Sequence, residues 1–270
     1  MAKKPRLIDC IFCGEKLVPR AVEDVIPLWL ANKMAHYAVE AQKAQGKPGD
    51  RANYVSYVYA DPDQMAKDAD DNTMGANATS ALPLGRIPNA LILPDVCKTC
   101  NGGWMSNLEE VAKKLIPGFL EGKSKTIDPF EQLILAMWVI KTCIAYDATN
   151  DERYIPEEYG SRLIFNLGYP LPGTQVVIGH DAGTVQQGQI LHGRTRYPAE
   201  GVFVRAVHIG FRFDHFMCYM ALNMVDPPDT REQMTRVVEH VDRPWLSEIW
   251  PPKGRLVWPS DGAKVARPHR

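Results

Sequence analysis

Two Cys-x-x-Cys pairs constrain the fold of this chain more than any other feature of its sequence. Cys10 and Cys13 form the first pair and Cys97 and Cys100 the second, with 83 residues between the pairs. Two such pairs supply the four sulfur ligands of a tetrahedral zinc site, and their spacing is typical of metal knuckles. The alternative, four unrelated cysteines, is weaker because the same spacing occurs twice. We therefore predict that a zinc ion joins the two segments.

A zinc ion held by four thiolates has a closed coordination shell, so it binds neither substrate nor catalytic water. Its predicted role is structural, because it offsets the entropy lost when a long loop closes. The remaining two cysteines, Cys143 and Cys218, lie inside apolar segments. We expect them to be small buried core residues.

The composition is that of an ordinary globular protein. Of the 270 residues, 45% are hydrophobic and 23% are charged, and the length indicates one large domain or two smaller ones. The longest apolar run, at 133–140, is far shorter than the roughly 20 residues that cross a bilayer. The first residues carry charge with no apolar stretch behind it, so they lack the core of a secretory signal. We expect a cytoplasmic protein without a membrane partner.

Apolar periodicity and turn residues divide the chain into two expected regions. Residues 1–147 should form a zinc-binding domain with a helical extension, interrupted at 41–82 by a long insertion. The acidic residues of the insertion match no calcium loop, so a solvated surface is the better interpretation. Residues 148–270 should form a β-rich region with a basic tail that contains Pro and Trp. That tail either contacts phosphate or keeps the end of the chain in solution.

Local patterns predict an α+β fold. Asp128, Pro129 and Glu131 have the arrangement of a capping box with proline at the first helical position, which starts a helix. The expected helices span 25–39, 104–120 and 129–146. The expected strands span 54–59, 162–167, 174–178, 202–213 and 216–225.

Three segments follow one another over roughly residues 8–110: Cys10-x-x-Cys13-Gly14, Glu23-Asp24-Val25-Ile26-Pro27-x-Trp29-Leu30 and Cys97-x-x-Cys100-Asn101-x-x-Trp104. Their order resembles the zinc-containing branch of the HNH endonuclease family. In that family zinc holds a treble-clef-like ββα motif, and a second divalent ion such as Mg²⁺ lies between the hairpin and the helix. The resemblance therefore implies an HNH core, DNA as the substrate and an origin in a phage or mobile element.

The resemblance also implies roles for individual residues. In the family, an acidic residue just before a histidine binds the catalytic ion, and Glu23 matches that position. An Asn or His directly after the second knuckle completes the shell of the ion, which points to Asn101. An intermediate asparagine that orients the histidine would be Asn89. The position of the histidine itself is occupied by Asp24.

Asp24 changes the expected chemistry. The pKa of an unperturbed aspartate is about 3.9, against about 6.5 for histidine, so Asp24 is a feeble acceptor of a proton from water. General base catalysis contributes about 10²- to 10⁴-fold, and we expect hydrolysis to be slowed by that range. Asp24 and Glu23 can still form a two-carboxylate ion site. The alternative is a solvated acidic pair at the start of a helix.

The other histidines do not replace the missing one. His36 lies too far along the expected helix, and a lone histidine in a β-rich region is more often a structural residue than a catalyst. Four histidines that belong to that region are His180, His192, His208 and His215.

The tryptophans are expected to serve packing rather than base stacking. Trp29 and Trp104 adjoin apolar helical positions and should pack against the zinc scaffold. Trp250 and Trp258 each precede proline and are interpreted as surface packing of an extended tail.

Two functions follow from these observations. The first is an HNH-type nuclease that hydrolyses DNA phosphodiester bonds, with Glu23 and Asn101 holding a divalent ion and Asp24 acting as a weak base. The alternative is a catalytically inactive HNH-like module that binds nucleic acid or a protein partner. The net charge is −1, and residues 1–120 hold fourteen Lys or Arg against fourteen Asp or Glu. Any DNA-binding groove must therefore arise from charge segregation in the folded chain.

Overall fold

The computed structural model combines helices with strands, which confirms the expected α+β class. Three features singled out in the sequence lie outside the residues that it describes: Asn89, the acidic residues of the insertion, and residues 260–270 of the basic tail. The described residues are 7–21, 23–44, 46, 55–58, 79–80, 92–93, 95–150, 152–165, 170, 172–180, 188–199, 202–213, 215–226, 246–252 and 254–259.

Two short ribbons bring the cysteine pairs together. Strand β1 (Leu7–Ile8) pairs antiparallel with β2 (Val18–Pro19), and the first cysteine pair lies between them in the chain. Strand β3 (Glu23–Asp24) pairs antiparallel with β6 (Ile92–Leu93), which leads into the second cysteine pair. The β3–β6 ribbon therefore joins segments that are about seventy residues apart in the sequence.

Helix α1 (Leu28–Ala44) begins later than the sequence pattern indicates. The expected start at residue 25 is wrong because proline disfavours helical backbone in the residue before it, which here is Ile26. The backbone N–H groups of Leu30 and Ala31 both donate to the carbonyl of Pro27, so the first helical turn closes onto the proline.

The second cysteine pair starts a longer helical segment. Helix α3 (Lys98–Cys100) continues through a π-helical turn, η2 (Asn101–Met105), into α4 (Ser106–Leu120), with a kink at Gly103. The buried face of α4 has the three- and four-residue spacing of an amphipathic helix. Its members include Leu108, Ala112, Leu115, Ile116 and Phe119.

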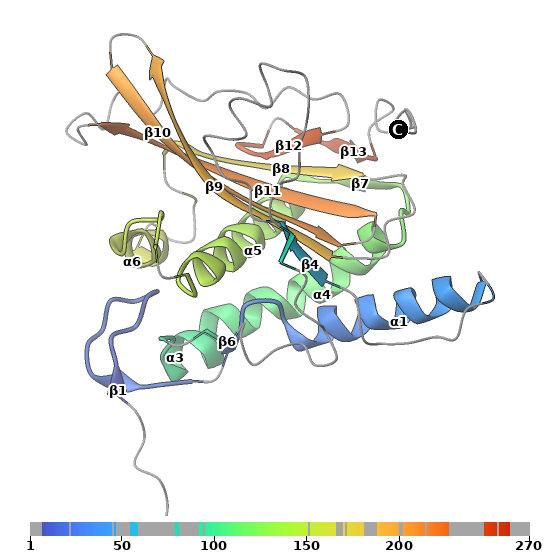
Figure 1. Ribbon diagram of the computed structural model, residues 1–270, viewed down its shortest axis with the longest axis horizontal. Helices are drawn as coiled ribbons and strands as arrows, with labels where there is room; N and C mark the ends of the chain where they lie inside the picture. Colours follow the sequence, from blue (N-terminus) through green and yellow to red (C-terminus); the bar gives the residue numbers. More distant parts are fainter. Residues whose placement is uncertain are drawn as a thin grey trace, which may run out of the picture.

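Helix α5 (Pro129–Asp147) is the central element of the molecule and has the predicted capping box. The N–H of Glu131 donates to Asp128 Oδ1 at 2.8 Å, and the N–H of Asp128 donates to Glu131 Oε2 at 3.2 Å. From Leu135 onward α5 is buried on every side. Figure 1 shows the reason: the large sheet lies over α5, and α4 and α1 lie beyond it on the other side.

Seven strands form the large sheet, in the order β12-β8-β11-β10-β9-β4-β5. Neighbours pair antiparallel except β4 and β9, which are parallel. The predicted strands at 54–59, 174–178, 202–213 and 216–225 are confirmed as β4, β8, β10 and β11. The bounds are β4 (Val55–Val58), β5 (Thr79–Ser80), β8 (Thr174–His180), β9 (Gly188–Ala199), β10 (Val202–Phe213), β11 (Phe216–Asp226) and β12 (Leu246–Trp250).

One predicted strand, at 162–167, is wrong. Residues in this range belong instead to helix α6 (Glu158–Phe165). Short apolar runs fit either a strand or a helix, and here the packing decides. Gly160 approaches the first knuckle so closely that a Cβ atom on it would lie 2.2 Å from the carbonyl oxygen of Ile11. A helix with a glycine at this point can rest directly on the knuckle backbone.

The interpretation of Trp258 as surface packing is also wrong. Strand β13 (Leu256–Trp258) pairs with β7 (Lys125–Ile127), and the Trp258 side chain is buried. Its ring packs edge-on against Phe119 with the centroids 4.8 Å apart. Trp250 is partly buried against the same core. The tail therefore packs against the molecule through the β7–β13 ribbon, which ends at Trp258.

A single buried cluster contains side chains from both expected regions of the chain. It extends from Cys10 and Phe12 at the first knuckle, through Trp138 of α5, to Phe211 of the sheet and Trp258. The two remaining cysteines, Cys143 and Cys218, are buried within it, as predicted.

Candidate metal centre

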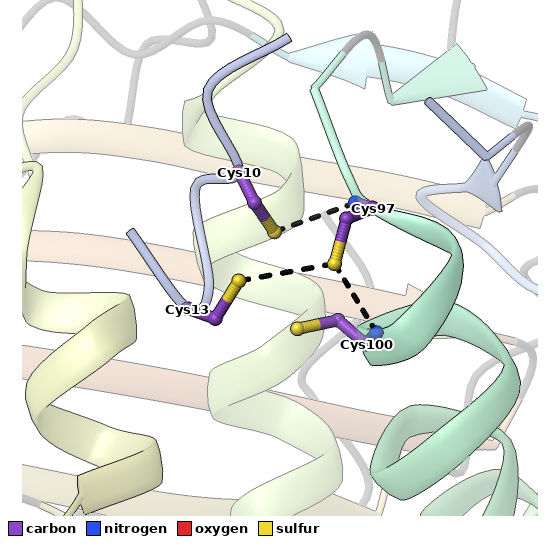
Figure 2. A group of neighbouring side chains, drawn as sticks. All are labelled: Cys10, Cys13, Cys97 and Cys100. Atoms are coloured by element: carbon purple, nitrogen blue, oxygen red, sulfur yellow. Dashed lines mark hydrogen bonds between the residues drawn. The ribbon is translucent and has the colours of Figure 1, made fainter. Parts of the chain in front are cut away.

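The four predicted cysteines meet in one cluster. All four sulfur atoms lie within 4.8 Å of one another, and Cys13 Sγ lies 3.8 Å from Cys97 Sγ. Figure 2 shows the four side chains converging on one point from two segments. Sulfur atoms that surround a tetrahedral ion with bonds of about 2.3 Å are about 3.8 Å apart. The cluster could therefore hold a metal ion such as zinc.

Local backbone geometry makes each pair into a knuckle. In the first, Gly14 adopts a φ of +71°, and its N–H donates to the carbonyl of Cys10 at 2.9 Å. In the second, Cys97 caps helix α3, and its sulfur accepts a hydrogen bond from the N–H of Cys100 at 3.3 Å. Glycine adopts a positive φ without steric cost, which suits the turn after Cys13.

Backbone hydrogen bonds also join the two knuckles. The N–H of Ile11 donates to the carbonyl of Asp95 at 3.0 Å, and that of Ala21 donates to Val96 at 2.7 Å. The N–H of Cys97 also donates to the sulfur of Cys10 at 3.4 Å. These hydrogen bonds and the four sulfur atoms join the same two segments of the chain.

The surroundings shift the pKa values of Cys10, Cys13 and Cys100 in different directions. The Cys100 side chain and neighbouring backbone N–H groups lower the pKa of Cys10 to about 4, whereas burial raises the pKa of Cys13 to about 11. The pKa of Cys100 is also raised, first by its hydrogen bond to Cys10. Cys10 is thus favoured as the thiolate, whereas deprotonation of Cys13 and Cys100 is opposed. A bound divalent cation removes that opposition because thiolates are the form that binds metal.

Aromatic and helical packing encloses the cluster. Phe12, between the first two cysteines, is fully buried, and Trp104 packs edge-on against it with the centroids 5.4 Å apart. Trp29 and Trp104 both pack against the core, as predicted from their neighbours. Helix α6 adds cover at the first knuckle, where Gly160 contacts the backbone of Ile11.

The predicted nuclease residues lie close in sequence to the cysteine pairs. Glu23 and Asp24 form β3, and the side chain of Glu23 is outside the described part of the structure. Asn101 directly follows the second knuckle, and its backbone N–H donates to the carbonyl of Cys97 at 3.0 Å. Neither Glu23 nor Asp24 is part of a helix start, because β3 precedes α1 by several residues.

Asp24 has charged neighbours that the sequence did not reveal. Its side chain is partly buried, and burial followed by the negative charge of Glu109 raises its pKa, while the positive charge of Lys141 opposes the rise. Lys141 Nζ lies 2.5 Å from Glu109 Oε1, and the Lys141 side chain is completely buried. Three elements, β3, α4 and α5, therefore each contribute one charged group to the same place.

A sequence signal for Lys141 existed. It is the only charged residue between Glu131 and Asp147, inside an otherwise apolar helix. A lysine in such a series is either at the edge of the buried face or paired inside it. Glu109 offered no comparable signal, because Glu110 stands beside it and only the fold shows which of the two faces inward.

His180, His192, His208 and His215 have partners outside the cysteine cluster. His180 and His215 stack with centroids 5.5 Å apart beside Gly122, at the opposite end of α4 from the second knuckle. His192 Nε2 lies 2.8 Å from Asp147 Oδ1, and Asp147 also accepts hydrogen bonds from two backbone N–H groups. His208 hydrogen-bonds with Tyr219 on a neighbouring strand. Each of these four histidines therefore has a ring or hydrogen-bond partner within the fold.

Comparisons with protein-family models, with curated proteins and with solved structures find no match to this chain. Among the helices of the described residues, none has the length and apolar character needed to cross a membrane.

Proposed function

We propose that the four-cysteine cluster binds one zinc ion and that the ion is structural. The support is the donor set, since four thiolates in tetrahedral arrangement suit zinc and leave no coordination position open. Elemental analysis of the purified protein should find one zinc per chain. Absence of stoichiometric zinc from protein purified without chelator would contradict this assignment.

We further propose that the chain is an HNH-like nuclease that hydrolyses DNA phosphodiester bonds with the help of a second divalent ion. One observation carries the proposal. Asp24 lies on strand β3, which pairs with β6, the strand that leads into the second knuckle. Helix α4, which follows that knuckle, carries Glu109, whose negative charge acts on Asp24. This strand, strand and helix order is the order that the resemblance implies for an HNH core.

The residues have distinct proposed roles. Glu23 and Asn101 hold the second ion, for which their oxygen atoms are suitable ligands. Asp24 accepts the proton of the attacking water, and the raised pKa that burial and Glu109 give it makes it a better acceptor than an exposed aspartate. The ion, when bound, lowers the pKa of water and stabilises charge on the phosphate.

A plasmid-nicking assay tests this function with Mg²⁺, Mn²⁺ and Ni²⁺ in turn. We expect slow nicking that Glu23→Ala abolishes, and faster nicking by Asp24→His, by up to the 10²- to 10⁴-fold that a general base contributes. Glu110→Ala is the matched control, since Glu110 carries the same charge on the exposed side of α4. Zinc content should be equal in all variants.

A catalytically inactive binding module is the second candidate. The ion pair between Lys141 and Glu109 favours the binding module, because the Lys141 ammonium group already compensates the charge of the Glu109 carboxylate. The near-neutral composition of residues 1–120 is also more easily reconciled with a protein partner than with DNA. Failure of both the wild type and Asp24→His to nick DNA under every metal would select this candidate over the nuclease.

A further inference from the structure

Helix α6 rests on the backbone of the first knuckle. A Cβ atom on Gly160 would lie 2.2 Å from the carbonyl oxygen of Ile11 and 3.1 Å from the Cα of Phe12. These are the two residues between the first pair of cysteines. The Cβ of the next helical residue, Ser161, lies 3.7 Å from the place that a Cβ on Gly14 would take. Helix α6 therefore packs directly on the turn that carries two of the four sulfur atoms.

The first knuckle is held between α6 and the segment of the second knuckle. The N–H of Ile11 donates to the carbonyl of Asp95, two residues before Cys97, and the carbonyl of Ile11 faces Gly160 of α6. Of the four cysteines in the cluster, three are buried and Cys13 is half-buried. Release of a bound ion requires these sulfur atoms to separate, and the contact with α6 opposes movement of the first knuckle.

Helix α6 is in turn fixed to the large sheet. The Tyr159 hydroxyl hydrogen-bonds with Thr174 Oγ1, at the first residue of β8. Both residues are buried, with 4% of the surface of each exposed. Figure 1 shows α6 between the N-terminal segment that contains β1 and the strands of the sheet. The helix therefore links the metal centre to the C-terminal region of the chain.

A buried carboxylate fixes the loop that leads into α6. Asp147, the last residue of α5, accepts hydrogen bonds from the backbone N–H of Tyr154 at 3.1 Å and from that of Ile155 at 2.9 Å. His192 Nε2, on β9, lies 2.8 Å from Asp147 Oδ1, and the His192 ring stacks on Tyr154 with the centroids 4.6 Å apart. The loop is thus held against both α5 and the sheet just before α6 begins.

We propose that residues 152–165, the loop and α6, form a clamp that controls how fast the metal centre releases zinc. The contacts of the clamp with β8, β9 and α5 keep α6 on the first knuckle, and the two knuckles separate only after α6 lifts. Local openings of this kind depend on the few contacts that hold the moving element. The proposal rests on the zinc site proposed above, and it assigns the β-rich region a role in retaining the metal.

Transfer of zinc from the purified protein to a chromogenic chelator tests the clamp. Thr174→Val removes the oxygen that pairs with the Tyr159 hydroxyl and keeps the shape of the side chain, so it weakens the closed clamp. We expect zinc release to become about 2- to 10-fold faster, the factor that corresponds to the net contribution of one hydrogen bond. The transfer is followed well below the melting temperature, where global unfolding does not contribute.

Thr142→Val is the matched control. Thr142 Oγ1 also makes a buried hydrogen bond, but to the carbonyl of Trp138 within α5. We expect this variant to lower the melting temperature about as much as Thr174→Val and to release zinc at the rate of the wild type.

A second comparison acts on the other side of α6. Gly160→Ala places a Cβ atom against the carbonyl of Ile11 and should also speed zinc release. Gly118→Ala, on α4, adds a Cβ that meets nothing within 4 Å and should leave the release rate unchanged. This comparison decides the question if Thr174→Val does not fold.

The outcomes separate the clamp from the zinc site on which it rests. Equal release rates for Thr174→Val and Thr142→Val, in protein that holds one zinc per chain, would overturn the clamp and leave the zinc site standing. Equal rates for Gly160→Ala and Gly118→Ala would have the same meaning. Absence of zinc from the wild type would overturn both proposals.

Discussion

Single residues decide how closely the elements around the metal centre approach one another. Gly160 of α6 has room for a hydrogen atom but not for a Cβ, because the carbonyl of Ile11 would lie 2.2 Å away. The sequence around Gly160 is compatible with a strand, and the absence of a side chain at this position is what lets α6 rest on the first knuckle.

We expect Gly160→Ala to destabilise the protein by about 1 to 3 kcal/mol, as overpacking against a fixed neighbour does. Thermal unfolding of zinc-loaded protein measures the change. Gly118→Ala is the control, because Gly118 is also helical and a Cβ there meets nothing within 4 Å. That control should be neutral or should stabilise the protein slightly, since alanine favours helix over glycine by about 0.5–1 kcal/mol. Equal stability of the two variants would contradict the tight packing of α6.

His208 should make stability depend on pH. Burial lowers its pKa from 6.5 to about 4 in the folded chain. Between these values the unfolded chain binds a proton and the folded chain does not, so acid favours unfolding. The full shift corresponds to about 3 kcal/mol, lost progressively as the pH falls from 6.5 to 4.

Denaturant titrations of the wild type and His208→Gln at pH 7 and pH 5 measure this effect. The variant should lose less stability than the wild type on acidification. His36→Gln, on the exposed surface of α1, should behave like the wild type. Parallel pH profiles for wild type and His208→Gln would show that the buried histidine does not contribute.

At the scale of elements, helix ends and strand alternation follow local chemistry closely. The capping box at Asp128 and Glu131 starts α5 at the predicted position, and the alternating pattern of β10 and β11 predicts both strands to within one residue. The start of α1 and the nature of α6 were predicted less well. In α1 the proline outweighs the apolar periodicity, and in α6 a contact with a distant segment selects the helix.

Asp128→Ala should cost about 1 kcal/mol, because it removes the oxygen that accepts the N–H of Glu131 and leaves that donor unsatisfied. Chemical denaturation measures the loss. Asp128→Asn keeps a good capping oxygen and should retain most of the stability. An Asn variant as unstable as the Ala variant would assign the effect to charge rather than to capping.

At the scale of the whole molecule, the metal centre and the sheet share one buried core. Phe12 at the knuckle, Trp138 of α5 and Phe211 of the sheet all belong to the same cluster. A substitution that disrupts a knuckle should therefore also destabilise the sheet, because α4 and α5 share the same core with both.

Cys13→Ala tests this coupling. We expect loss of stoichiometric zinc and a decrease in the free energy of unfolding of more than about 4 kcal/mol, as for loss of a structural metal. The melting temperature of Cys13→Ala should be lower than that of the wild type. It should be the same whether it is measured by circular dichroism in the far ultraviolet or in the near ultraviolet. Cys218→Ala, which removes a buried sulfur that is not in the cluster, should keep its zinc and lose less stability. Retention of zinc by Cys13→Ala would refute the four-ligand site.

Sequence alone was enough for those features whose physics is local. The spacing within each Cys-x-x-Cys pair identified the four cysteines as metal ligands, and a four-sulfur site needs both pairs however far apart they lie in the chain. Capping and strand alternation were equally readable, since hydrogen bonding and burial repeat within a few residues. Only the tertiary structure decided that Glu109 pairs with the buried Lys141, that α6 is a helix, and that Trp258 is buried. These depend on contacts between segments far apart in the chain, and local periodicity carries no information on which distant surfaces pack together.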